Sequence, residues 1–312
     1  MTQPLGKNGR LRDQADIYNF VNYGSTHCRP IPDILNEILV PSELFHDVKD
    51  ANWFLEKGKQ WKRPKQLWKS LWYDGEVAVL FADTNIGKSI YAIQIANAIA
   101  GTGERVLYFD FEMSSRQFYS RFSDPDTGEM FQFNEGFLRT EPDRSIDYFG
   151  DMDYCLGQIL RACDMADCNK IVIDNVSWLL SNAANDSMAG RFMNGILDFK
   201  WKEGISSLLI AHTPKRKLSD PLDQNSLAGA KKIANFADSM FAIGQSAHAD
   251  GGRYIKQLKV RSGGIEYGKN NVILCRLVKE GANLHFVEDG FAPEQTALTG
   301  IFPLPEVIEQ KG

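Results

Sequence analysis

The sequence predicts an α/β fold, in which helices flank a central and mostly parallel sheet, antiparallel hairpins come late and a small helical extension comes first. From Leu71 onward, apolar runs of strand length alternate with helix-like segments, which is typical of a parallel sheet covered by helices. The run Val77–Phe81 leads through a loop into a long apolar helix. After residue 250, short alternating runs are separated by Gly-rich turns, which favours antiparallel pairing.

Residues 1–70 differ from the rest, and we expect them to form an N-terminal helical extension or linker. The segment starts polar, contains a short apolar stretch at residues 31–44 and ends in a basic run at residues 57–69 that includes Trp61 and Trp68. Cations interleaved with aromatics suit a single-stranded nucleic acid. The competing interpretation is a linker whose tryptophans pack on the core. It rests on the helical spacing of four apolar residues, namely Leu67, Trp68, Leu71 and Trp72.

The core elements follow from the apolar runs. Five core strands are expected, at Val77–Phe81, Val106–Phe111, Lys170–Asp174, Ser206–His212 and Ser239–Gly244. The helix Ile90–Ala100 is apolar nearly all round and stops at Gly101, so it should be buried against the sheet. Three late strands should form the antiparallel extension, at Arg253–Val260, Asn271–Leu277 and Leu284–Val287. The expected regions are therefore 1–70 (extension), 71–292 (core) and 293–312 (tail).

Composition limits the function classes. The chain has 312 residues and a net charge of −5, which argues against a uniformly basic nucleic-acid coat but leaves local basic runs as candidates. Its five cysteines are scattered, and no secretory leader precedes them, so we expect reduced thiols in a cytoplasm. Cys163 and Cys168 lack a second pair at zinc spacing, so they do not indicate a metal site. No apolar run approaches membrane-spanning length, so no membrane partner is expected.

The segment after the first core strand has the pattern of a phosphate-binding loop. In such a loop, backbone N–H groups surround the phosphates, Lys88 reaches the β and γ oxygens and Ser89 ligates Mg²⁺. The alternative is an ordinary buried strand–turn–helix. The pattern usually begins with Gly, whereas this one begins with Ala82, so the turn must form with a Cβ present. The expected nucleotide-binding residues are Asp83, Thr84, Asn85, Ile86, Gly87, Lys88, Ser89 and Ile90.

Two carboxylates lie where hydrolysis of a triphosphate needs them. Glu112 comes just after a strand end, where it can accept a proton from a water lined up on the γ-phosphate. Asp110 competes for that role, and Glu112 is alternatively an acid favoured by a helix N-terminus. Asp174 ends an apolar strand and is the expected second Mg²⁺ contact, reached through water or through Ser89.

Three further side chains are candidates for acting on the phosphates. His212 closes a strand and opens a basic loop, so it can sense the γ-phosphate and pass the signal to that loop, although a lone His is more often structural. Lys259 and Arg261 alternate along a late strand and point the same way, which suits the charge on a transferring phosphoryl group. A solvated hairpin tip is the alternative.

The ordered set of motifs resembles the hexameric RecA-like helicases, most closely the plasmid RepA-type replicative helicases and more distantly the DnaB type. The motifs are GKS at 87–89, EMS at 112–114, the strands ending in Asp174 and His212, LAGA at 227–230 with Ala237-Asp238, and Lys259–Arg261. The resemblance covers about residues 68–290. It implies a RecA-like ATPase core that uses ATP and Mg²⁺, with Glu112 as catalytic base, His212 as phosphate sensor, and Lys259 and Arg261 acting on a neighbour's ATP.

The same resemblance implies partners. It predicts a homo-oligomeric ring, most simply a hexamer, that moves on single-stranded DNA with a primase or replication initiator as a further partner. Two Gly/Ser/Asn/Lys-rich loops are candidates for gripping DNA, Ser181–Arg191 and Thr213–Asn225. The second concentrates positive charge in Lys215, Arg216 and Lys217. An ATP-gated clamp or loader without unwinding and a small-molecule kinase are the rival functions.

Overall fold

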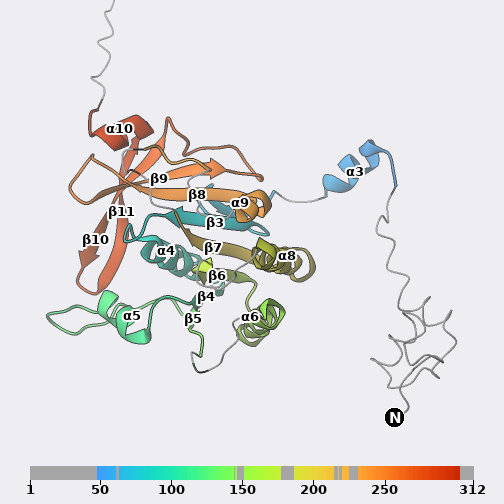
Figure 1. The fold of residues 1–312 in the computed structure, drawn as a ribbon, viewed down its shortest axis with the longest axis horizontal. Coiled ribbons are helices and arrows are strands. Elements are labelled where there is room, and N and C mark those ends of the chain that lie inside the picture. Colours follow the sequence, from blue (N-terminus) through green and yellow to red (C-terminus); the bar gives the residue numbers. More distant parts are fainter. Residues whose placement is uncertain are drawn as a thin grey trace, which may run out of the picture. The chain divides into compact units, whose positions relative to one another are not determined.

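The computed structural model describes residues 48–60, 63–143, 145, 151–176, 186–213, 217, 220–224 and 231–302. The chain divides into two units, Met1–Lys62 and Arg63–Gly312 (Figure 1). In the first unit the described helix is α3 (Ala51–Gly58). It begins at Asp50, whose side chain accepts hydrogen bonds from the backbone N–H groups of Asn52 and Trp53, and none of its residues is buried.

A nine-stranded sheet forms the centre of the second unit, in the order β11-β10-β9-β8-β3-β7-β6-β4-β5 (Figure 1). Six neighbouring strands run parallel: β3 (Val77–Ala82), β4 (Val106–Asp110), β5 (Phe137–Thr140), β6 (Lys170–Asp174), β7 (Ser206–His212) and β8 (Ser239–Gln245). Three antiparallel strands extend it beyond β8: β9 (Gly252–Lys259), β10 (Val272–Glu280) and β11 (Asn283–Ala292). The predicted fold class is therefore confirmed.

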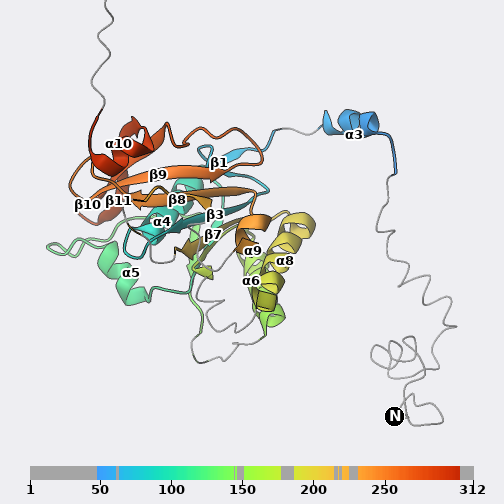
Figure 2. The same cartoon turned by 45° about the horizontal axis from the view of Figure 1, so that its top comes forward.

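Helices cover both faces of this sheet (Figures 1 and 2). The first face carries α4 (Lys88–Ala100), and the opposite face carries α6 (Met152–Ala166), α8 (Asp186–Glu203) and α9 (Lys231–Phe236). Two short helices complete the unit, α5 (Ser115–Arg121) and α10 (Glu294–Thr299), of which α10 contacts β9 and β10. Among the described helices, none is both long and apolar enough to cross a membrane.

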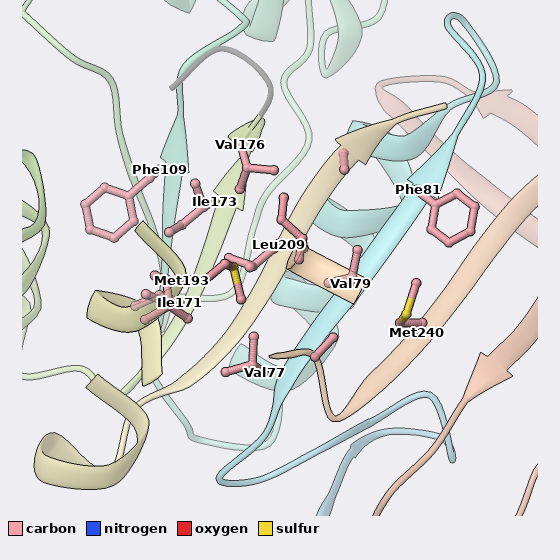
Figure 3. Packing of buried hydrophobic residues seen from close by; sticks show 14 of the residues in the cluster. Val77, Val79, Phe81, Phe109, Ile171, Ile173, Val176, Met193, Leu209 and Met240 are labelled. Carbon is pink, nitrogen blue, oxygen red and sulfur yellow. The ribbon is translucent and has the colours of Figure 1, made fainter. Parts of the chain in front are cut away.

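Strand alternation on β3 explains why both faces need cover. Val77, Val79 and Phe81 point toward the α8 face, where Leu209 and Met193 pack near them (Figure 3). Their chain neighbours Ala78, Leu80 and Ala82 point toward α4. Every residue of β3 is buried, so its continuous apolar run reflects a central strand of a parallel sheet.

The helix expected from the spacing of Leu67 to Trp72 is wrong, because this segment is a two-stranded antiparallel sheet. Its strands are β1 (Gln66–Trp68) and β2 (Trp72–Tyr73). Lys69 adopts a left-handed φ of 46°, which fits a reversal of the chain between them. Trp68 donates from Nε1 to Tyr91 Oη of α4 at 2.9 Å, so this tryptophan packs on the core. Trp61 and residues 31–44 lie outside the described residues.

The division after Lys62 and the packing of α10 place residues 63–70 and α10 in the same unit as the sheet. The sequence predicts region boundaries at 70/71 and 292/293, which place these segments in the extension and the tail. Glu294 shows how firmly α10 is attached, because its buried carboxylate accepts from Lys256 Nζ at 2.5 Å and from Tyr254 Oη at 3.0 Å. The late strands and the helix after them therefore share one core.

Candidate nucleotide site

The loop that joins β3 to α4 encloses its own lysine. Gly87 precedes α4 with φ 109°, a conformation that favours glycine, and Asn85 has φ 64°. Lys88 is buried and donates from Nζ to the carbonyl oxygen of Asp83 at 3.0 Å. Burial lowers the pKa of Lys88, while the carboxylates of Asp174, Glu112 and Asp83 act in the opposite direction. The ammonium thus lies inside the loop, where phosphate oxygens would be bound.

Alanine in place of the first glycine is accommodated because Ala82 still belongs to the strand. Its partners in the parallel pairing are His212 of β7 and Ile243 of β8. Among the described non-glycine residues, those with left-handed φ values are Lys69, Asn85 and Asp167, so Ala82 needs no conformation that a Cβ disfavours. The departure from the usual pattern therefore leaves the loop intact.

Asp174 ends β6 as a fully buried carboxylate. Its pKa is raised to about 6, chiefly by burial and in part by the neighbouring Glu112 and Asp110, whereas hydrogen bonding by Ser89 and Tyr108 acts in the opposite direction. Tyr108 Oη donates to Oδ2 at 2.6 Å. The other oxygen, Oδ1, is buried and has no hydrogen-bond partner of standard geometry among the described residues.

This donor set fits Mg²⁺. The buried carboxylate of Asp174 and the hydroxyl of Ser89 beside it offer the hard oxygen ligands that Mg²⁺ prefers alongside phosphate and water. Within the described residues, no three His, Cys, Asp or Glu side chains cluster as a metal cage. The site therefore suits an ion held mainly by nucleotide phosphates, with Ser89 and Asp174 as the protein's contribution.

One amide joins two of the predicted catalytic side chains, Glu112 and His212. Asn175 Nδ2 donates to Glu112 Oε2 at 2.7 Å and lies 3.1 Å from His212 Nε2. Because the amide N–H is the donor, Nε2 of the imidazole is the acceptor. Burial and the charge of Lys88 lower the pKa of His212, so the ring is neutral at pH 7. Asn175 is not among the residues predicted from the sequence, although its position directly after Asp174, at the end of β6, was an available signal.

Asp110 and Glu112 have different surroundings. Asp110 Oδ1 accepts from the backbone N–H groups of Glu112 and Met113, at 3.2 and 2.7 Å, and its Oδ2 accepts from Arg139 Nε at 3.0 Å. It is fully buried and fixes the turn after β4. Glu112 is exposed and contacts the Asn175 amide, so its position suits a base that must reach water.

A known protein family has a model that matches much of this chain. The model of the AAA domain family matches residues 43–217, which is more than half of the chain and includes the loop, Glu112, Asp174 and His212. The chain belongs to the AAA domain family. This AAA domain protein is therefore a P-loop ATPase of the AAA/RecA-like type. Among curated proteins, none matches the chain.

Lys259 and Arg261 lie away from this AAA-domain site. Lys259 pairs with Met240 near the start of β8, whose Ser239 lies beside Ala78 at the amino end of β3, whereas the phosphate loop follows the carboxyl end. Lys259 Nζ donates to the carbonyl oxygens of Ala234 and Asn235 at the end of α9, at 2.9 and 3.4 Å. The structure thus does not bring the pair to the loop of its own chain.

Arg261 is held by a buried carboxylate at that edge. Its Nη1 donates to Asp238 Oδ1 at 2.9 Å, while Asp238 Oδ2 accepts from Lys200 Nζ at 2.7 Å and from the backbone N–H of Val77 at 3.0 Å. About 60% of the Arg261 side chain is exposed. The Arg261 guanidinium is therefore held by Asp238 on one side and remains accessible to solvent on the other.

The first residue of the basic loop after β7, Thr213, contacts the start of the phosphate loop. Thr213 donates from its backbone N–H to Ala82 O at 3.2 Å and from its hydroxyl to the Asp83 carboxylate. Lys217 is exposed, whereas Lys215 and Arg216 lie outside the described residues. Of the other predicted loop, Ser181–Arg191, residues 186–191 belong to α8, so the loop expectation is wrong there, and 181–185 lie outside the description.

Proposed function

We propose that this AAA domain protein is an ATP-driven motor that moves on single-stranded DNA as a homo-oligomeric ring, of the kind that its resemblance to RepA-type replicative helicases implies. The observation that supports it is a continuous set of contacts. Asn175 joins Glu112 to His212, and the next residue, Thr213, ties the start of the basic loop to Asp83. Such contacts can carry the state of the γ-phosphate to a nucleic-acid loop.

In this proposal, each polar side chain of the site has a role in ATP hydrolysis. Lys88 and the loop N–H groups bind the phosphates, and Glu112 accepts the proton of the attacking water. Asn175 holds the Glu112 carboxylate, and neutral His212 is placed to report the γ-phosphate. When bound, Mg²⁺ would neutralise charge on the β and γ oxygens, with Ser89 and Asp174 as its protein ligands.

Arg261 is proposed to act on the ATP of a neighbouring subunit. It lies at the amino ends of the parallel strands, so it is badly placed for its own loop, and its exposed head is available to another chain. An arginine supplied in trans can raise turnover by roughly 10³–10⁵. Cooperation between subunits would then be obligatory for hydrolysis at full rate.

A mixing experiment tests that role. Arg261→Ala should keep ATP affinity near normal and lose most turnover, and so should Glu112→Gln. Mixed together, the two variants should regain activity wherever an intact Glu112 meets an intact Arg261. Inactive mixtures that demonstrably co-assemble, or a verified monomer with full turnover, would show that Arg261 is an ordinary surface residue.

The DNA-motor proposal is tested by ATPase rates with and without single-stranded DNA, solution mass and strand displacement. Replacing Lys215, Arg216 and Lys217 with Ala should weaken DNA binding and flatten its salt dependence, because fewer counterions are released. The control replaces the exposed Lys49, Lys202 and Lys269 in the same way.

Three outcomes are informative. If DNA affinity depends on salt concentration equally in the two triple variants and in wild type, the basic run at residues 57–69 becomes the better candidate for the DNA site. ATP hydrolysis without strand displacement would indicate a clamp or loader. An ATPase rate indifferent to DNA, together with no measurable DNA binding, would refute the motor.

A further inference from the structure

The late antiparallel strands reach back to the phosphate loop through Arg253. This residue is the second of β9, and its Nε donates to the carbonyl oxygen of Ile86 at 3.2 Å. Its Nη1 donates to the carbonyl oxygens of Gly251 and Gly252, at 2.8 and 2.9 Å. The guanidinium is thus fixed between the β8–β9 turn and the loop.

A second contact comes from Phe286 of β11. A Cβ at Gly87 would lie 2.8 Å from the Phe286 ring, so the ring occupies the space that the glycine leaves. The backbone of Phe286 is held on α4, because Gln94 Nε2 donates to its carbonyl oxygen at 3.0 Å and Gln94 Oε1 accepts from its N–H at 2.8 Å. Tyr91 packs edge-on against the same ring, with centroids 5.2 Å apart.

These contacts matter because a phosphate loop works by orientation. Its N–H groups must point inward at the phosphates. The Ile86 carbonyl then needs a partner elsewhere, since an unpaired carbonyl is costly in a half-buried setting. Arg253 supplies a charge-assisted bond to that carbonyl and places a positive charge beside a site for a polyanion.

Resting on the ATP binding proposed above, we infer that Arg253 and Phe286 are positioning residues for the nucleoside triphosphate. They hold Ile86 and Gly87 in the phosphate-binding conformation, and Arg253 adds favourable potential for phosphate. Both residues follow residue 217, where the AAA domain match ends, so the nucleotide site of this chain extends beyond the matched region.

The test is direct ATP binding by the full chain, with turnover measured beside it. Arg253→Gln should weaken ATP binding about tenfold while kcat at saturating ATP changes less than twofold, because the reacting groups are untouched. Arg253→Lys should recover part of the affinity, since it restores a charge but not the guanidinium geometry. Phe286→Leu, which keeps an apolar side chain for folding, should also weaken binding.

Arg276→Gln is the matched control. Arg276 lies on the adjacent strand, and its guanidinium binds Asp289 at 2.7 to 3.0 Å. Unchanged ATP affinity in Arg253→Gln, or an equal loss in Arg276→Gln, would overturn the inference while leaving the ATPase proposal standing. If wild-type protein bound no ATP, the proposed function would fail and this inference with it.

Discussion

Asp174→Asn should stabilise the protein in the absence of nucleotide and Mg²⁺, although it removes a metal ligand. Burial raises the pKa of Asp174 from 3.8 to about 6. The carboxyl group of Asp174 therefore binds its proton more tightly in the folded state than in the unfolded state. Folding is penalised wherever the unfolded chain would ionise the group, so stability falls as pH rises from about 4 to 6, and the loss is complete above that window.

The size of this penalty follows from the shift. About two pKa units at roughly 1.36 kcal/mol each give about 3 kcal/mol at pH 7 and above. Asparagine carries no charge at any of these pH values, and its carbonyl oxygen can still accept the hydrogen bond of Tyr108. The variant should therefore gain up to about 3 kcal/mol in free energy of unfolding at pH 7.5, and almost nothing near pH 4.

Urea denaturation in EDTA at several pH values between 4 and 8 measures the difference. The wild-type and variant curves should converge at the acid end and separate through pH 5 and 6. Adding Mg²⁺ and a non-hydrolysable ATP analogue should stabilise wild type much more than the variant, because only wild type keeps the carboxylate ligand. Parallel pH curves, or a variant less stable than wild type at pH 7.5, would refute this account of Asp174.

The other predictions concern single side chains. Lys88→Ala should lower ATP turnover by about 10²-fold or more and leave the circular dichroism spectrum unchanged, because the lysine serves phosphate and not core packing. Glu112→Gln should bind ATP normally but lose about 10²–10⁴ in turnover in a steady-state assay, since an amide cannot accept the proton. Asn175→Ala should lower turnover about tenfold at unchanged ATP affinity, measured in the same assays, because Glu112 loses its hydrogen bond. Gly136→Ala should reduce the free energy of unfolding by about 1–3 kcal/mol in urea titrations, because a Cβ there would lie 2.2 Å from the carbonyl oxygen of Glu104.

Much of the fold was readable from local pattern. Continuous apolar runs located five of the six parallel strands to within a residue, because strands covered on both faces need no polar alternation. The sixth, β5, was not predicted, since this four-residue edge strand is only half-buried and carries Arg139 and Thr140. For the segment from Leu67 to Trp72, the local pattern predicted a helix, and this prediction was wrong. Four apolar residues there fit helical spacing, but the hairpin that buries Trp72 and sets Trp68 on Tyr91 satisfies the same residues better.

The site was readable only in part. Strand ends and the loop pattern placed Lys88, Glu112 and Asp174 near one another, since parallel strands bring their carboxyl ends to one edge. Arg139 and Arg253 were not predictable, because each contacts the site region from a strand far along the chain, 29 residues after Asp110 and 167 after Ile86. Single-sequence patterns carry no information about such pairs.

The separation of Arg261 from the phosphate loop has a consequence for symmetry. The loop follows the carboxyl end of β3, and Arg261 lies beyond the strand that pairs with β8 at the opposite end. A head-to-tail contact that brings Arg261 of one copy to the loop of the next joins unlike surfaces and is heterologous, whereas a two-fold dimer would need one self-complementary surface that contains both Arg261 and the loop. Repeated heterologous contacts either close into a cycle or continue as a filament. A closed cycle completes every site, whereas an open arc of subunits always ends on one incomplete site, whatever the number of copies.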